Sequence, residues 1–387
     1  MKIYYVTGIV WDEKQAPTVH VDEICKGLIK LGHVVTLYVP SPRNSEFNRN
    51  YPIIGVPTFR TFLLFWYQIR LFSRLCSDLR ANHPDIIYSR NNGLFFVPAL
   101  VSRIFNIPLI LEVNGRLIEE VSFEGTILSN ILSKCGVFKI IETFNFKSAS
   151  GLIAVKDGIK DYIVSVYGID PGKTKVITNG VDISMFRPIP TPKAREETLL
   201  DSSALYIGYI GSFYDWQGLK HIVEAARLVC PQVPNAKFLI LGAGSEANNL
   251  KALVSQYNLE KCVEIHSAVN HDRVPLYINS LDICLSYPDK FRGGATSPFK
   301  IYEYLACAKC VVMADIEGIR EEFGDVVAYA PPESPHDLSS VLLALLNDSP
   351  KRSALGSAGR AWIEKGRTWE FAARQTADFC KLILGIP

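Results

Sequence analysis

The stretch KIYYVTGIVWDEKQAPTVHVDEICKGLIKLGHVVTLYV, residues 2–39, contains the pattern that decides the fold. It opens with Lys2–Val6, a short apolar run typical of a buried parallel strand. A loop and a helical pattern over Thr18–Leu31 follow, and Gly32 stands where helices commonly end. His33–Val39 predicts the next strand. We therefore expect one strand–helix–strand unit, whose crossover should be right-handed.

The same alternation continues along the chain and restarts in its second half. Strands are predicted at Asp85–Tyr88, Leu109–Val113, Gly151–Val155 and Lys175–Ile177, and then at Leu205–Ile210, Lys237–Leu241, Val263–His266, Asp282–Ser286, Cys310–Met313 and Val326–Tyr329. Between the two series, Pro188–Asp201 is rich in proline, threonine and charge and predicts an interdomain linker. Two such series predict two Rossmann-like α/β domains facing a central cleft, with ligands at the carboxyl ends of the strands.

The expected boundaries follow from this pattern. Residues 1–188 are expected to form an N-terminal Rossmann-like domain, and residues 189–366 a C-terminal Rossmann-like domain. Residues 367–387 contain a last helix, from about Trp369 to Leu384, which packs on either domain and could cross back to the first.

Composition excludes several classes of protein. The 387 residues are 48% hydrophobic and 21% charged, with a net charge of +2, as in soluble globular proteins. Nucleic-acid binding is not expected, because it usually requires a strongly basic domain. The nine cysteines predict buried, reduced thiols in a cytoplasmic protein, and no metal site is expected.

One segment, TFLLFWYQIRLFSR at residues 61–74, has two interpretations. Its helical pattern gathers apolar residues on one face with basic residues beside them: Phe62, Phe65, Trp66 and Ile69, with Arg70 and Arg74. A core helix packing on the N-terminal sheet is the favoured interpretation. The alternative is an interfacial helix that contacts anionic lipid at the inner face of the membrane. No apolar run is long enough to span a bilayer.

The stretch KFRGGATSPFKIYEYLACAKCVV, residues 290–312, is the most informative for chemistry. Ser297 and Pro298 are a strong helix start, with serine at the N-cap and proline in the first turn. Lys300 and Glu303 then lie on one face of the helix. A carboxylate there can accept hydrogen bonds from ribose hydroxyls, each contributing about 1.5–3 kcal/mol.

The loop before this helix favours an anionic ligand. Gly293 and Gly294 let the backbone approach a ligand closely. The amino end of a helix offers free N–H groups and the positive end of a dipole, which suit a phosphate. From spacing alone, an ordinary capped helix with an exposed Lys–Glu pair remains an equal alternative.

This segment resembles the donor-binding motif of glycosyltransferase family 4, the group 1 transferases of GT-B fold, in the branch with the pattern SPxKxxEYLA. Glu303 occupies the position of the family's second motif glutamate, which implies contact with the ribose of the nucleotide. The first motif glutamate falls on Ala295, so the resemblance implies that sugar recognition depends on the amides around Gly293, Gly294 and Thr296. Ser297 opens the same cradle.

Two further strings resemble family signatures. Asn179–Asp182 with Phe186 and Pro188 is similar to NGVDxxxFxP. The stretch IGSFYDWQGL, residues 210–219, resembles the glycine-rich loop after the first strand of the donor domain and contains Gly211.

The glycine-rich loop departs from the family pattern, because the arginine and lysine that normally hold the diphosphate are Ser212 and Gln217 here. A leaving diphosphate requires fixed positive charge. Lys300 is the best replacement and Arg292 the second. Trp216 stacks on the donor or packs inside the protein.

The resemblance implies two more contacts. Val269 follows a segment whose backbone pairs with the nucleobase in the family. Asn114, at the end of a predicted strand, is a candidate for binding hydroxyls of the donor sugar or the acceptor. The GxG at Gly242–Gly244 is expected to shape a turn rather than to hold phosphate.

The expected function is therefore a retaining, metal-independent glycosyltransferase that moves a sugar from a nucleoside-diphosphate sugar to a hydroxyl of a glycan, a lipid-linked molecule or a small molecule, as in polysaccharide biosynthesis. The nucleotide sugar is a co-substrate, and no cofactor is expected. Two alternatives stay open: a nucleotide-sugar epimerase on the same fold, and an inactive nucleotide-sugar-binding subunit, which Ser212 and Gln217 would suit. The sequence does not identify the donor sugar, the nucleobase, the acceptor or the oligomeric state.

Overall fold

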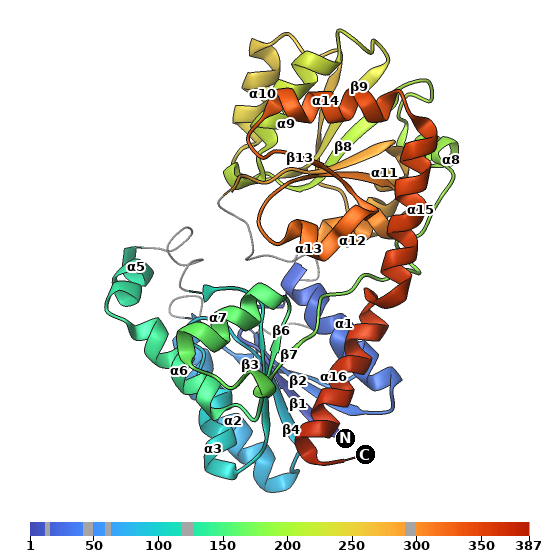
Figure 1. Ribbon diagram of the computed structural model, residues 1–387. Coiled ribbons are helices and arrows are strands. Elements are labelled where there is room, and N and C mark those ends of the chain that lie inside the picture. Colours follow the sequence, from blue (N-terminus) through green and yellow to red (C-terminus); the bar gives the residue numbers. More distant parts are fainter. Residues whose placement is uncertain (12–15, 42–48, 59–62, 118–126, 291–298, 387) are drawn as a thin grey trace. The chain divides into compact units, whose positions relative to one another are not determined.

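The computed structural model describes residues 1–11, 16–41, 49–58, 63–117, 127–290 and 299–386 (Figure 1). These residues divide into two compact units. The first contains residues 1–179 and 369–386, and the second contains residues 180–290 and 299–368. Each unit is described by itself.

The first unit is built on a parallel sheet with strand order β3-β2-β1-β4-β5-β6-β7. Its strands are β1 (Lys2–Val6), β2 (Val34–Ser41), β3 (Ile53–Pro57), β4 (Ile86–Arg90), β5 (Leu109–Val113), β6 (Gly151–Ala154) and β7 (Thr174–Val176). The central strands are almost wholly buried, as expected for apolar runs covered on both faces. The edge strand β3 was not predicted, because its five residues contain a glycine and end on a proline.

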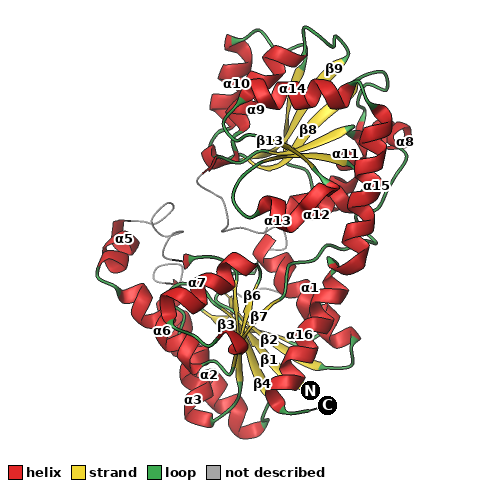
Figure 2. Ribbon diagram, viewed as in Figure 1, coloured by secondary structure: helices red, strands yellow, loops and turns green. Residues whose placement is uncertain are grey.

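Helices lie on both sides of this sheet (Figure 2). They are α1 (Ala16–Lys30), α2 (Leu63–Ala81), α3 (Val97–Phe105), α5 (Ile127–Lys134), α6 (Val137–Ser148), α7 (Asp157–Tyr167) and α16 (Trp369–Leu384). The last helix, α16, packs on α1. A side chain at Gly27 would lie 2.3 Å from the Cβ of Ala373, so the glycine allows the two helices to approach closely.

Helix α2 is a core helix, as favoured for residues 61–74, but the face expected to pack on the core is wrong. The helix is anchored by Tyr67 and by residues that follow it at helical spacing, all of which are buried. The predicted apolar face is instead in contact with solvent: Phe65 is 59% exposed, Trp66 39% and Ile69 47%. Phe62 lies outside the described residues. The helix therefore packs on the core through a neighbouring face that the sequence pattern did not distinguish.

The second unit has a parallel sheet with strand order β10-β9-β8-β11-β12-β13. Its strands are β8 (Leu205–Ser212), β9 (Ala236–Ala243), β10 (Val263–Ser267), β11 (Ile283–Ser286), β12 (Cys310–Ala314) and β13 (Ala328–Ala330). Its α-helices are α8 (Thr191–Thr198), α9 (Leu219–Val229), α10 (Ala247–Gln256), α11 (Val274–Ser280), α12 (Phe299–Ala306), α13 (Ile319–Phe323), α14 (Pro335–Leu346) and α15 (Ser349–Gly366). Both units are thus Rossmann-like α/β folds with an apolar core around each sheet.

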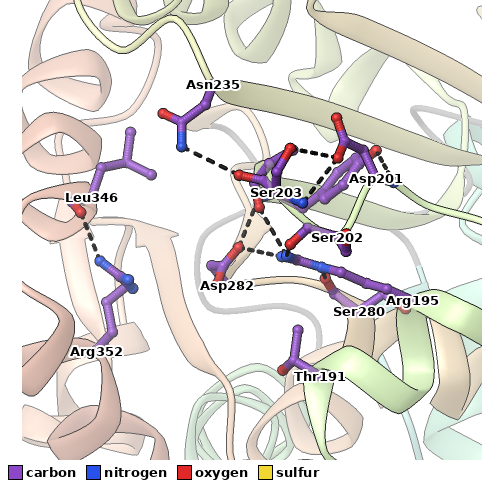
Figure 3. A network of polar contacts seen from close by, with 12 residues as sticks. Thr191, Arg195, Asp201, Ser202, Ser203, Asn235, Ser280, Asp282, Leu346 and Arg352 are labelled. Carbon is purple, nitrogen blue, oxygen red and sulfur yellow. Dashed lines mark hydrogen bonds and ion pairs between the residues drawn. The ribbon is translucent and has the colours of Figure 1, made fainter.

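Helix α8 lies where a linker was expected, so that expectation is wrong for residues 191–198. The helix is held by three buried side chains, Ala194, Arg195 and Thr198, of which Arg195 forms the main polar network (Figure 3). The Arg195 guanidinium donates to Asp282 Oδ2 at 2.7 Å and to the carbonyl oxygens of Ser280 at 3.0 Å and Ala204 at 2.8 Å. An ion pair replaces the apolar stripe of an ordinary surface helix, so the periodicity that predicts helices is weak here.

Two glycines at the end of β9 pack against the backbone at the end of β8. A Cβ at Gly242 would lie 1.7 Å from the carbonyl oxygen of Gly211, and one at Gly244 would lie 2.3 Å from that of Phe213. The GxG string therefore shapes the end of the sheet, as expected.

All nine cysteines are free thiols. The expectation that they are buried fails at Cys135, which is exposed, and is only partly met at Cys76, Cys230 and Cys262. Cys307 and Cys310 have the C-x-x-C spacing of many metal and redox sites, but both are buried, and desolvation raises the pKa of each thiol to about 12. These two thiols are therefore unreactive core residues.

Candidate functional site

The first turn of α12 brings Lys300 to the end of β8. Its Nζ donates to the Tyr209 hydroxyl at 2.7 Å and to Gln217 Oε1 at 3.0 Å. The same amine lies 4.1 Å from the centre of the Tyr209 ring. Desolvation lowers the pKa of Lys300 to about 7, against the opposing charge of Glu303. The amine is therefore poised to gain a full charge when an anion approaches it.

The backbone at the end of β8 packs closely against the Lys300 amine. A Cβ at Gly211 would lie 2.9 Å from Lys300 Nζ, so a larger residue there would displace the amine. The buried Tyr304 hydroxyl accepts a hydrogen bond from the N–H of Ile210 at 2.8 Å and donates one to the carbonyl oxygen of Ile210 at 3.1 Å. Helix α12 therefore fixes the strand end that faces its own lysine.

The loop after β8 contains an aromatic pair. The ring of Trp216, which is half-buried, stacks on that of the exposed Tyr214, with centroids 6.1 Å apart and planes at 15°. The Trp216 carbonyl oxygen accepts from the N–H of Asp289 at 3.0 Å, and the carbonyl oxygen of Ser212 accepts from the Tyr209 hydroxyl at 2.8 Å. The loop is thus held at both ends, and the two rings form a platform next to Gln217.

Glu303 lies one turn after Lys300 and contacts a histidine. His271, in the 3-10 turn His271–Arg273, places Nε2 3.4 Å from Glu303 Oε1. Val269 lies in the short loop between β10 and this turn, partly buried against the core. The structure therefore brings together Lys300, Gln217 and Gly211, and separately pairs Glu303 with His271.

Six residues of the expected site fall in the gap between residues 290 and 299, outside the described residues. They are Arg292, Gly293, Gly294, Ala295, Thr296 and Ser297.

A second polar cluster occupies the carboxyl end of β5 in the first unit. The Glu112 carboxylate is 2% exposed and accepts from Asn114 Nδ2 at 2.6 Å and from the Tyr88 hydroxyl, and His20 Nε2 lies 2.8 Å away. Burial alone would raise the pKa of Glu112, but the charge and hydrogen bond of His20, with Arg90 and Tyr88, lower it to about 2. Because an ionised carboxylate only accepts hydrogen bonds, the Asn114 amide must turn its NH2 group toward Glu112. Its oxygen is left for another partner.

Sequence reasoning missed several of these partners. Glu112 had a usable signal, because a carboxylate inside the apolar strand LILEV must be paired. No sequence signal marked the other partners, since an isolated histidine or tyrosine in such contexts is usually a core or loop residue. These partners are His20, Tyr209, Tyr304 and His271.

The structure describes no group of three or more histidine, cysteine, aspartate or glutamate side chains arranged to hold a metal ion. Among the same residues, no helix is both long and apolar enough to cross a membrane.

Two Rossmann-like units, with a partly buried amine at the carboxyl end of the second sheet, are typical of an enzyme that binds a nucleotide. The family models agree: residues 190–362 match "Glycosyl transferases group 1", and residues 18–185 match "Glycosyltransferase Family 4". The chain belongs to glycosyltransferase family 4 (group 1), the retaining transferases that use nucleoside-diphosphate sugars.

Curated relatives are distant in sequence. The chain is 21% identical over 385 residues to the uncharacterized glycosyltransferase MJ1607 of Methanocaldococcus jannaschii, covering 95% of this chain and 94% of the relative. It is 24% identical over 258 residues to an alpha-maltose-1-phosphate synthase of Mycolicibacterium smegmatis, covering 63% of this chain and 66% of the relative.

Solved structures share the fold over nearly the whole chain. A sucrose-phosphate synthase from Thermosynechococcus elongatus superposes with a TM-score of 0.78 at 15% identity, covering 99% of both chains. Anabaena HepE in complex with UDP superposes with a TM-score of 0.77 at 17% identity, covering 98% of this chain and 99% of HepE. The two parallel sheets therefore form a GT-B fold.

Proposed function

We propose that Lys300 supplies the positive charge for the donor diphosphate in this glycosyltransferase. The observation that supports it is the 3.0 Å distance between Lys300 Nζ and Gln217 Oε1. The resemblance places a diphosphate-binding lysine of the family at position 217. Here the amine reaches that point from α12, so the charge is relocated rather than lost.

The polar partners of Lys300 suit this role. Tyr209 and Gln217 carry no charge. They position the amine by hydrogen bonds and do not compete with a bound anion as a carboxylate partner would. A diphosphate oxygen next to Lys300 would form a charge-assisted hydrogen bond, which is about twice as strong as a neutral one. Arg292 is a second candidate cation, and the amides from Gly293 to Ser297 complete the proposed cradle.

The remaining donor contacts are assigned to the same unit. Glu303 accepts from the ribose, and Trp216 stacks on the donor beside the loop of Gly211 and Ser212. The backbone at Val269 pairs with the base. These roles make residues 189–366 the donor domain. HepE has been solved with UDP and with UDP-glucose, so UDP-glucose is the first donor to test.

We assign acceptor binding to residues 1–188, with Asn114 in contact with a sugar hydroxyl. This is supported by the cluster at β5, because Glu112 fixes the Asn114 amide with its oxygen directed away from the carboxylate. That oxygen accepts from hydroxyl groups of the donor sugar or the acceptor.

Two variants separate the assigned roles. We expect Lys300→Met to weaken nucleoside-diphosphate binding by roughly 10-fold or more, since a charged hydrogen bond contributes about 1.5–3 kcal/mol. We expect Asn114→Ala to bind the nucleotide normally and to lose turnover. Calorimetry with UDP, ADP and GDP, followed by product assays with the matching glucose donors, measures both effects.

The control is Lys220→Met, which removes an exposed lysine of α9 close to the same loop. Unchanged nucleotide affinity in Lys300→Met would exclude the diphosphate role. A wild-type protein that binds none of the nucleotides would favour the inactive subunit. Epimerised sugar formed without an acceptor would favour the epimerase.

A lipid-linked acceptor and a peripheral membrane contact are supported by α2. Phe65, Trp66 and Ile69 are exposed apolar residues on one stretch of this helix, with Arg70 and Arg74 beside them. Such a face suits the surface of an anionic bilayer, which would place the enzyme in the cytoplasm at the inner face of the membrane.

Sedimentation with vesicles of phosphatidylglycerol and phosphatidylcholine tests this contact. We expect Trp66→Ser combined with Ile69→Ser to reduce vesicle binding several-fold, because two apolar side chains no longer enter the interface. Leu382→Ser, at an exposed apolar residue of α16, is the matched control. Equal sedimentation of all three proteins would exclude α2 as the contact.

A further inference from the structure

We infer that His271 is a positioning residue that orients the Glu303 carboxylate toward the ribose, and that the NGVDxxxF string of residues 179–186 braces this histidine. The inference rests on the proposed ribose role of Glu303 and adds to it. It gives the string a function in the nucleotide site, where the sequence alone indicated a turn.

The contact between the two side chains links separate elements of the second unit. His271 follows β10, whereas Glu303 lies on α12, and Nε2 of the first is 3.4 Å from Oε1 of the second. The His271 side chain is 41% exposed and that of Glu303 is 20% exposed, so both remain within reach of a ligand. Because the ionised carboxylate only accepts, His271 must donate from Nε2. The other oxygen of Glu303 is then available to ribose hydroxyls.

Phe186 supports the histidine from behind. Its ring is buried and meets the imidazole of His271 at 5.5 Å, with the planes at 63°. The position of Phe186 is set by the Asp182 carboxylate, which accepts from the N–H of Ser184 at 2.8 Å and of Met185 at 3.2 Å. The aspartate and the phenylalanine of the string therefore act together to place one ring against His271.

One guanidinium closes the arrangement. Arg360 donates from Nη1 to the carbonyl oxygen of Phe186 at 3.0 Å and to that of Ala306 at 2.6 Å. Ala306 is the last residue of α12, the helix that carries Glu303. The string and the helix that carries Glu303 are thus connected twice: through the contact of His271 with Glu303, and through the two backbone carbonyl groups that Arg360 binds.

This arrangement matters because a glutamate side chain has considerable freedom. Ordering such a rotamer-rich side chain on binding opposes affinity, and a contact that orders it beforehand reduces that loss. His271 therefore increases the affinity for the ribose hydroxyls without contacting them. A purely structural histidine would change the affinity for ribose and deoxyribose nucleotides equally.

Discrimination between ribose and deoxyribose provides the test. Affinities of UDP, ADP and GDP, each with its 2′-deoxy and 3′-deoxy counterparts, are measured by calorimetry for the full-length wild type, Glu303→Gln, His271→Ala and His271→Gln. The control is His336→Ala, at an exposed histidine of α14. We expect the wild type to prefer the ribonucleotide by roughly 10-fold or more, since a hydrogen bond to a charged acceptor is lost in the deoxy form.

The variants then separate the possible outcomes. We expect both Glu303→Gln and His271→Ala to lose most of this preference while the deoxy forms bind as in the wild type, which also shows that the fold is retained. His271→Gln should restore part of the preference, because its amide can donate to Glu303. If His271→Ala keeps the preference that Glu303→Gln loses, the positioning role is overturned and the ribose role stands. If Glu303→Gln keeps it as well, or if the wild type binds no nucleotide, the proposed function itself fails.

Discussion

The proposed chemistry of the donor site depends on one amine in an unusual environment. Lys300 is held by two neutral oxygens and the face of a tyrosine ring, and desolvation lowers its pKa to about 7. A charged lysine would be more stable in water. In the proposed role, this amine is readily charged when a diphosphate binds, because the anion would raise the pKa of the amine again.

This property predicts that nucleotide binding depends on pH. The pKa of Lys300 is about 7 in the free protein, so the amine is largely neutral above that value and binding must take up a proton. Between about pH 7 and 9, where the nucleotide phosphates no longer titrate, we expect the dissociation constant to rise by up to about 10-fold per pH unit. Calorimetry in buffers of different ionisation enthalpy measures both the affinity and the proton uptake.

The control for this pH dependence is a cation that does not titrate. Lys300→Arg stays charged at every pH tested, so its affinity should be nearly constant over the same range. A wild-type affinity that does not change between pH 7 and 9 would contradict the proposed state of Lys300.

The sequence indicated Lys300 as a substitute cation, but it could not indicate the environment of the lysine. Tyr209 and Gln217 are 91 and 83 residues away from it along the chain. No periodicity links such positions, and only the close approach of α12 to β8 and to the loop after it brings them together. The Glu112 cluster differs, because a carboxylate within an apolar strand announces that a partner exists, although not which one.

At the scale of elements, periodicity predicted the strands and helices that have an apolar face. The bounds of β5 agree residue for residue with the predicted stretch, since LILEV is an apolar pattern of the right length for a buried strand. Periodicity did not predict β3 or α8. The first is a short edge strand, and the second is held by a buried ion pair, so neither depends on the pattern that predicts elements.

The role of Arg195 in α8 can be tested directly. Arg195→Met removes the partner of Asp282 and the donor to three carbonyl oxygens, so we expect it to lower the free energy of unfolding of the second unit by about 2–3 kcal/mol. Urea unfolding, followed by hydrogen exchange of the strands β8 and β11, measures this loss.

Arg320→Met is the matched control, because Arg320 forms an exposed pair with Asp315. Exposed pairs contribute less than about 1 kcal/mol. Equal effects of the two substitutions would mean that α8 does not depend on the buried guanidinium.

At the scale of the whole molecule, the chain forms two Rossmann-like units, and its last helix returns to the first of them. The sequence predicted two such units because the strand–helix alternation restarts after the first series. It left the position of the last helix open, since an amphipathic helix of 16 residues can cover either sheet. Packing of α16 on α1 depends on Gly27, a residue that has no distinguishing signal in the sequence.

The central claim is that the second unit binds a nucleoside diphosphate with Lys300 on its phosphates. A crystal structure of the protein with UDP, or with ADP or GDP if these bind more tightly, measures this directly. We expect Lys300 Nζ at about 2.7–2.9 Å from a diphosphate oxygen, the range of charge-assisted hydrogen bonds. A nucleotide bound at another place, or one whose diphosphate leaves Lys300 in contact with Tyr209 and Gln217 alone, would contradict the account.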